Sequence, residues 1–151
     1  MCTFKYFVKY FPCMLLPAEI ESKTLIPALR AILAKKLAEQ HKIREDEISK
    51  MLGVTQAAIS NYIRGTRGDP KLIAQLMSQK QIVEMVDEIS DNLASNKAYT
   101  PASLSKFIGL CNYIKSSLLI CDIHHHLESN IDEAICKECE TMLLKGPGSV
   151  Y

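Results

Sequence analysis

The stretch from Gly53 to Gly65 constrains the fold of this 151-residue chain more than any other part of the sequence. Thr55 is suited to cap a helix that begins at Gln56, because its hydroxyl can accept a hydrogen bond from a first-turn backbone N–H. Gly65 suits the left-handed residue that ends such a helix. Apolar residues recur between them at helical spacing, at Ala58, Ile59, Tyr62 and Ile63. The stretch therefore predicts a short helix with one buried face.

The opposite face of this predicted helix is polar. It carries Gln56, Ala57, Ser60, Asn61 and Arg64. Apart from the alanine, these side chains donate or accept hydrogen bonds. The small side chain of Ala57 would let the helix approach another surface closely.

A second short helix is predicted immediately upstream, from Glu45 to Leu52. Ile48, Met51 and Leu52 would turn inward from it, and Gly53 would supply the tight turn between the two helices. A short helix, a glycine turn and a helix with a polar face form the helix-turn-helix of DNA-binding proteins. An ordinary helical hairpin that touches no nucleic acid is the alternative interpretation.

Residues 53–62, Gly-Val-Thr-Gln-Ala-Ala-Ile-Ser-Asn-Tyr, resemble the turn and recognition helix of the Cro/phage-repressor (XRE-like) class. The loop of residues 64–68, Arg-Gly-Thr-Arg-Gly, also resembles the loop that follows this helix in the class. Core and turn positions agree at Ile48, Leu52, Gly53, Val54, Ile59 and Tyr62. The longer segment of residues 25–68 resembles a group of small archaeal regulators with cysteine-rich C-terminal modules. The resemblance implies a transcriptional regulator that binds specific DNA sequences.

The polar face and the resemblance together predict which residues contact double-stranded DNA. These residues are Thr55, Gln56, Ala57, Ser60, Asn61, Arg64 and Arg67. Residues 44–47, Arg-Glu-Asp-Glu, depart from the class, which favours small or amide-bearing residues at the start of the first motif helix. Acids in a first turn suit the helix dipole but repel phosphate, so we assign Asp46 no contact with DNA.

Charge is divided unevenly along the chain, although the net charge is only +1. Residues 1–70 contain 11 Lys and Arg and 7 Asp and Glu, which gives +4, whereas residues 71–151 contain 7 and 10, which gives −3. All four arginines lie in the front part, at Arg30, Arg44, Arg64 and Arg67. Because phosphate is neutralised by cations at the docking surface, this distribution favours a basic front module attached to a neutral or acidic rear module.

The remaining pattern predicts an all-α fold. A first long helix is expected over residues 21–40, with Pro27 near its start and Lys35 and Lys36 free to reach phosphates or solvent. Its core stripe is Ile26, Leu29, Leu33 and Leu37. A further helical stretch runs from Asp69 to Leu93, with an apolar stripe at Ile82, Val86, Ile89 and Leu93. This second stripe favours packing onto the motif, and a dimer interface is the alternative.

A polar hinge at residues 95–99 divides the chain into a DNA-binding domain, residues 20–94, and a small helical cysteine-rich module, residues 100–145. Thr100 and Pro101 are suited to begin a helix there. Its predicted inner face comprises Leu104, Phe107, Ile108, Cys111, Ile114 and Leu118. We expect residues 1–19 to be an N-terminal extension, with Met14 as a second possible start, and residues 146–151 to be a flexible tail.

The rear module holds a candidate metal site. Four of the six cysteines lie there, at Cys111, Cys121, Cys136 and Cys139. The last two are three residues apart, so both thiolates can face one ion, and four thiolates suit either Zn²⁺ or an iron–sulfur cluster. His124, His125 or His126 could instead replace one thiolate in a Cys₃His zinc site. A reversible thiol/disulfide switch and plain core cysteines remain the other interpretations.

These features predict a regulator that works as a homodimer in the cytoplasm. One repressor-type motif contacts too few bases for useful specificity, so we expect two copies on a palindromic operator. No apolar run approaches the roughly 18 residues that cross a bilayer. An enzyme is disfavoured, because we find no nucleophile elbow, phosphate-binding glycine loop or Ser/His/acid set. The alternatives are a protein-interaction module that uses a repressor-like fold and a redox enzyme subunit.

Overall fold

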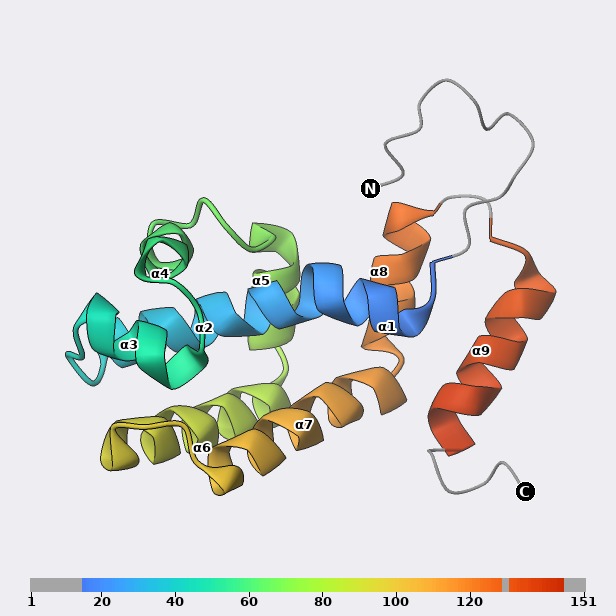
Figure 1. Ribbon diagram of the computed structural model, residues 1–151. Coiled ribbons are helices and arrows are strands. Elements are labelled where there is room, and N and C mark those ends of the chain that lie inside the picture. Colours follow the sequence, from blue (N-terminus) through green and yellow to red (C-terminus); the bar gives the residue numbers. More distant parts are fainter. Residues whose placement is uncertain (1–14, 129–130, 146–151) are drawn as a thin grey trace.

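The computed structural model describes residues 15–128 and 131–145, and all the regular structure in these residues is helical (Figure 1). The predicted all-α class is therefore confirmed. Most of the expected N-terminal extension and the expected tail, residues 1–14 and 146–151, lie outside the described residues. The elements are α1 (Pro17–Ile20), the π-helical turn η1 (Glu21–Leu25), α2 (Ile26–Glu39), α3 (Glu45–Leu52), α4 (Gln56–Ile63), α5 (Pro70–Met77), α6 (Lys80–Asn96), α7 (Pro101–Ser116), α8 (Leu119–Leu127) and α9 (Glu133–Lys145).

Helix α2 is the central element of the fold, because α3, α4, α5 and α6 all pack on it. Its buried residues go most of the way round the helix, and they include Ala28, Leu29, Ala31, Ile32, Leu33, Ala34 and Leu37. Figure 1 shows α4 on one side of α2 and the α6–α7 pair on the other. A helix with neighbours on both sides needs apolar residues on more than one face.

Pro27 is the second residue of α2 and so lies near a helix start as predicted, although helical structure already begins upstream. The helix begins at Pro17, and the turn η1 separates this beginning from Pro27. In η1 the N–H of Ile26 donates to the carbonyl of Glu21, five residues back. This wider turn immediately precedes Pro27, which has no N–H for the regular helical ladder. The expected helix start was therefore wrong by about one turn.

The stripe of α6 is buried within a single copy of the chain. Ile82, Val86, Ile89 and Leu93 are each at most 1% exposed, and they share one core with α2 and α7. Packing onto the motif domain is confirmed. The alternative, a dimer interface built from this stripe, is wrong, because these four side chains have no surface left for a second copy.

Helix α7 turns a different face inward from the one predicted. Leu104 and Ile108 are 41% and 50% exposed, whereas Leu110, which lies outside the predicted inner face, is fully buried. The inward positions are Ser103, Phe107, Leu110, Cys111 and Ile114. Ser103 is buried at the start of this face because its side chain completes a capping box with Thr100. Leu104 and Ile108 each follow an inward residue, and one residue turns an α-helix by about 100°.

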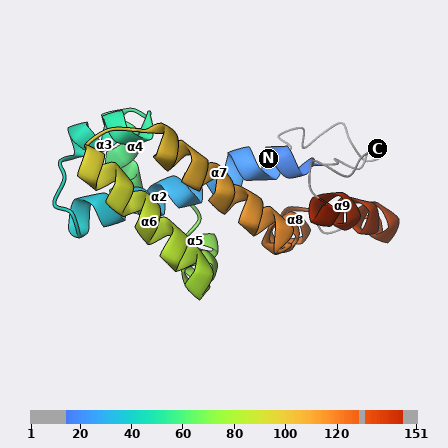
Figure 2. The same ribbon diagram turned by 90° about the horizontal axis from the view of Figure 1, so that it is seen from below.

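The core continues across the polar hinge. Leu110, Cys111 and Ile114 of α7 belong to the same buried cluster as the residues of α2 and the motif. Helix α8 packs on α1 and α7, and α9 makes only a small contact with α7. Figures 1 and 2 show the motif helices and α9 at opposite ends of the molecule. No helix that the structure describes is both long enough and apolar enough to span a membrane.

Candidate nucleic-acid interface and rear cysteines

The two motif helices begin and end where the sequence predicts. Helix α3 covers Glu45–Leu52, and Gly53 follows it with φ +63°, the left-handed conformation that the turn requires. Helix α4 covers Gln56–Ile63, and the Thr55 hydroxyl accepts a hydrogen bond from the N–H of Ala58 at 3.1 Å. The predicted cap and glycine turn are therefore confirmed.

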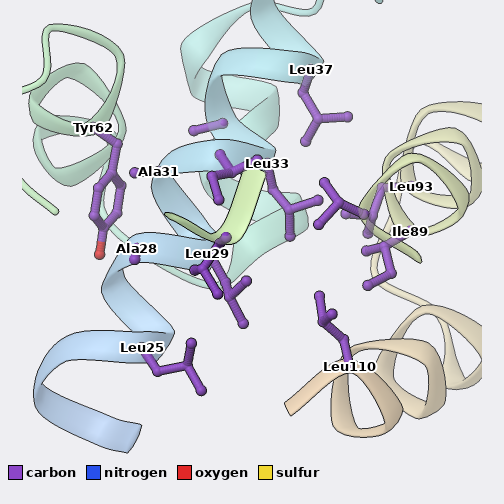
Figure 3. Close-up of a cluster of buried hydrophobic side chains, with 14 of the residues drawn as sticks. Leu25, Ala28, Leu29, Ala31, Leu33, Leu37, Tyr62, Ile89, Leu93 and Leu110 are labelled. Atoms are coloured by element: carbon purple, nitrogen blue, oxygen red, sulfur yellow. The ribbon is translucent and has the colours of Figure 1, made fainter. Parts of the chain in front are cut away.

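The inner face of α4 is fixed against the central helix. Ala58, Ile59 and Tyr62 are buried, and Figure 3 shows the Tyr62 ring beside Ala28 and Ala31 of α2. Two alanines at this contact leave room for the aromatic ring between the helices. The motif is thus held by close packing on the inner face of α4.

The outer face of α4 is only partly open. Thr55, Gln56, Ala57, Arg64 and Arg67 are exposed, whereas Ser60 and Asn61 are half-buried. No residue that the structure describes makes a hydrogen bond to the Gln56 amide group. The exposed first turn of α4 therefore presents a hydrogen-bonding amide beside a small alanine.

The two half-buried polar residues hold the motif together. The Ser60 hydroxyl donates to the carboxylate of Glu45, which joins α4 to the first turn of α3. The Asn61 side-chain oxygen accepts from Arg64 and from Thr66, each at 3.3 Å. Sequence reasoning missed these bonds. The charged start of α3 was the available signal for the first of them.

Two of the three acids in the first turn of α3 have partners. Glu45 accepts from Ser60, and the Asp46 carboxylate lies 3.1 Å from the Arg44 guanidinium. The positive charge of Arg44 offsets the negative charge of Asp46, whereas the neutral Ser60 hydroxyl satisfies a hydrogen bond of Glu45 without cancelling its charge. The acidic turn that departs from the class pattern therefore has a structural use inside the motif.

The loop after α4 is drawn back onto the core. Gly68 has φ +92°, and a Cβ atom at this position would lie 3.2 Å from the Cβ of Ala31. Gly65 has φ +75° and confirms the predicted helix end. The Arg67 guanidinium carbon lies 5.1 Å from the centre of the Tyr62 ring, within the range of a cation–π contact. This loop places two arginines beside the C-terminal end of α4.

Of the two lysines considered for phosphate contact, Lys36 is already paired. Its Nζ atom lies 2.5 Å from the Asp87 carboxylate of α6, and its side chain is only 13% exposed. Lys36 therefore joins α2 to α6 and is not free for phosphate. Lys35 is half-buried and makes no ion pair with any described residue.

Cys111 lies apart from the other rear cysteines. It is buried on α7, and its charged neighbours are Glu21 and Lys115, which form an ion pair at 3.1 Å. Burial, and then the negative charge of Glu21, raise the pKa of the Cys111 thiol to about 12. The surroundings therefore keep this thiol protonated.

The other three cysteines are grouped between α8 and α9. Burial, followed by the charges of Cys139, Glu140 and Cys136, raises the pKa of Cys121 to about 11. The Nε2 atom of His125 lies 3.5 Å from the sulfur of Cys136. Among residues 15–128 and 131–145, however, no group of three or more Cys, His, Asp or Glu is arranged closely enough to hold a metal ion.

The three histidines of α8 have different neighbours. His124 is buried, and its Nε2 atom lies 2.6 Å from the Glu128 carboxylate, which also accepts from the N–H of Leu15. His126 lines a groove between α5 and α8. His125 is therefore the histidine that stands next to a cysteine.

Comparison with family models identifies residues 35–78 as a match to the model described as helix-turn-helix. These residues extend from the middle of α2 to the end of α5 and include both motif helices. Comparisons with curated proteins and with solved structures give no match. The closeness to small archaeal regulators stays a prediction.

Proposed function

We propose that this chain, whose residues 35–78 form a helix-turn-helix of the Cro/C1 type, is a transcriptional regulator that reads specific sequences in double-stranded DNA. The exposed first turn of α4 carries the proposal, because it stands on a rigidly packed motif and has two arginines beside its far end. Base readout needs such a helix in the major groove, and phosphate contacts need cations near it.

Gln56 is the residue to which we assign base readout. Its amide can make two hydrogen bonds to adenine, and the methyl group of Ala57 can contact thymine. Ser60 and Asn61 act from within the motif, because their side chains are bonded to Glu45, Arg64 and Thr66. We assign Arg64 and Arg67 to phosphates or base edges at the end of the helix. Thr55 supports the same surface through its cap.

Selection of bound sequences from a random DNA pool tests this function. The wild-type chain should enrich one motif, and Gln56→Ala should relax the preference at one base pair by about 1–3 kcal/mol. Gln81→Ala, on the exposed face of α6, is the matched control and should leave the preference unchanged. A pool with no enriched sequence would favour a protein-interaction module. An unchanged preference in Gln56→Ala would remove Gln56 from base readout.

We further propose that two copies bind a palindromic operator and meet through α7. Leu104 and Ile108 are one turn apart on α7 and are both exposed. The neighbouring residues Ser103 and Phe107 line the same cavity as the Gly53 turn, so this part of α7 lies near the motif. A joint there keeps two recognition helices closer together than a joint through α9 at the other end of the molecule.

Sedimentation at micromolar concentration tests the dimer. Leu104→Glu combined with Ile108→Glu should convert a dimer to a monomer, because a buried joint does not accept two charges. The matched control, Met142→Glu with Leu144→Glu on α9, also changes two exposed apolar residues and should leave the dimer intact. A wild-type monomer, with and without DNA, would contradict the proposal.

For the rear cysteines we propose a zinc site made by Cys121, Cys136, Cys139 and His125, which bound zinc would draw closer together than they lie in this structure. The donor chemistry supports this set, because three thiols and one imidazole suit tetrahedral zinc. A site with four cysteines would require Cys111 to leave its buried place beside Glu21. Bound zinc would join α8 to α9 and hold a helix that has little packing of its own.

The metal content of purified protein tests this assignment. Cys136→Ser with Cys139→Ser should abolish zinc binding, and His125→Ala should weaken it, whereas Cys111→Ser should retain one zinc per chain. Loss of metal in Cys111→Ser, or a coloured protein with bound iron, would instead indicate the four-cysteine cluster.

A further inference from the structure

A cavity of about 350 Å³ separates the motif from the α6–α7 pair. Its walls come from α2, the end of α3, the Gly53 turn, α6 and the beginning of α7. Leu33, Leu52 and Phe107 give it apolar walls. Cavities of roughly 300–1,000 Å³ with mostly apolar walls are typical binding sites for small molecules. Neither the DNA-reading face nor the cysteine group uses this space.

Two cations face this cavity, Arg30 from α2 and Lys50 from α3. None of the described residues that line it is acidic. Arg30 is half-buried, and neither cation makes an ion pair or a side-chain hydrogen bond with a residue that the structure describes.

Three other cations in the same part of the molecule are paired, whereas Lys35 of α2 is unpaired among the described residues but lies outside this cavity. Lys36 is bound to Asp87, Arg44 to Asp46, and Lys106 to Glu88. Arg30 and Lys50 therefore differ from their neighbours: they come from two helices, face one cavity and have no acid in its lining. A partly buried guanidinium gains most from a partner that supplies the missing negative charge.

We propose that this cavity binds a small amphipathic anion, with its acid group held by Arg30 and Lys50 and its apolar body against Leu33, Leu52 and Phe107. An inorganic anion would leave the apolar walls uncovered, and a neutral apolar molecule would leave the two cations without a partner. The lining therefore requires both parts of the ligand.

Such a ligand would contact the end of α3 and the Gly53 turn, away from the exposed face of α4. Lys50 and Leu52 belong to the last turn of α3, and Gly53 forms the turn that leads into α4. A ligand bound to Arg30 and Lys50 ties this turn to the central helix, so it changes the affinity of α4 for DNA. This regulatory part depends on the proposed DNA-binding function, whereas the binding of the anion does not.

Calorimetry with decanoate tests the cavity, with 1-decanol as the neutral probe and acetate as the probe without an apolar body. We expect one decanoate per chain and at least tenfold weaker binding of the other two. Arg30→Gln and Lys50→Gln should each weaken decanoate binding about tenfold, because each removes a charged hydrogen-bond donor. Lys80→Gln, an exposed lysine at the start of α6 outside the cavity, should bind as the wild type does.

Equal binding of decanoate and 1-decanol, or no loss of affinity in Lys50→Gln, would overturn the anion site. Lys50 is exposed, so this variant tests the site without a risk to the fold. Mobility shifts with the selected DNA, with and without decanoate, separate the two proposals. Failure to bind DNA with normal decanoate binding removes only the proposed function. DNA binding without any decanoate binding removes only the cavity site.

Discussion

The motif and the terminal helix α9 are both built from short helical segments, but a single copy of the chain buries only the motif. Ile48, Met51, Ile59 and Tyr62 are at most 1% exposed, whereas none of the residues of α9, all of which the structure describes, is buried. An isolated helix of this length is marginal in water, so α9 needs support from elsewhere. The comparison indicates that one copy of the chain packs the motif completely and leaves α9 with little packing of its own.

The largest expected difference is in the free energy of unfolding, when an isoleucine of the motif and an isoleucine of α9 are each replaced by alanine. Ile59→Ala should lower the free energy of unfolding by about 2–5 kcal/mol, because it opens a cavity in the core. Ile135→Ala on α9, where the side chain is 44% exposed, should change it by no more than about 0.5 kcal/mol. Urea unfolding followed by circular dichroism measures both. An equal loss for the two variants would show that α9 is covered.

Two glycines, one in the closely packed loop after α4 and one in α7, allow a second comparison of the free energy of unfolding. Gly68→Ala should lower the free energy of unfolding by about 1–3 kcal/mol, because the new Cβ meets Ala31 and the positive φ is strained. Gly109→Ala, inside α7 with no atom near the added Cβ, should raise it by about 0.5–1 kcal/mol. Thermal unfolding compares them. Stabilisation by Gly68→Ala would contradict the described path of the loop.

Metal removal asks whether the two ends are coupled. Because α8 and α9 both contact α7, where we place the dimer joint, loss of the metal in Cys136→Ser with Cys139→Ser should weaken binding to a palindrome by about 1–3 kcal/mol, a typical coupling energy. Binding to a single half-site should stay unchanged, because the motif has its own core. Mobility shifts on both DNAs, after a check for equal helicity, make the measurement. Equal affinity for the palindrome would reduce the rear cysteines to a structural role.

The smallest expected effect concerns the loop after α4. Arg67→Ala should weaken all DNA sequences alike and reduce the slope of log affinity against log salt by about one, because one phosphate contact is lost. The free energy of unfolding of Arg67→Ala should fall by about 0.5–1 kcal/mol, the typical strength of an exposed cation–π contact. Titrations at several salt concentrations check this. A sequence-dependent loss would move Arg67 from phosphate contact to base readout.

Local sequence determined the motif almost completely. The cap at Thr55, the left-handed turn at Gly53 and the helix end near Gly65 were predicted at the residues where they occur. Each of these features depends on the conformation of a few neighbouring residues. The helical spacing of the apolar residues then identified the buried face of α4. The cavity beside Arg30 and Lys50 could not be predicted from a local sequence pattern, because its walls come from segments far apart in the chain.

Only the tertiary structure determined the neighbours of the residues outside the motif, such as those of α7, the rear cysteines and Lys36. Apolar residues occupy several faces of α7, so helical periodicity alone predicted that Leu104 and Ile108 would be buried. In the structure α7 packs on α6 with Leu110 buried, and Leu104 and Ile108 are exposed. Spacing grouped four cysteines, but the fold placed Cys111 beside Glu21, which lies 90 residues earlier. The pairing of Lys36 with Asp87 likewise joins residues 51 apart. Sequence spacing fixes which residues share a helix face, whereas the rotation of that helix against its neighbours is set by contacts that form only in the folded chain.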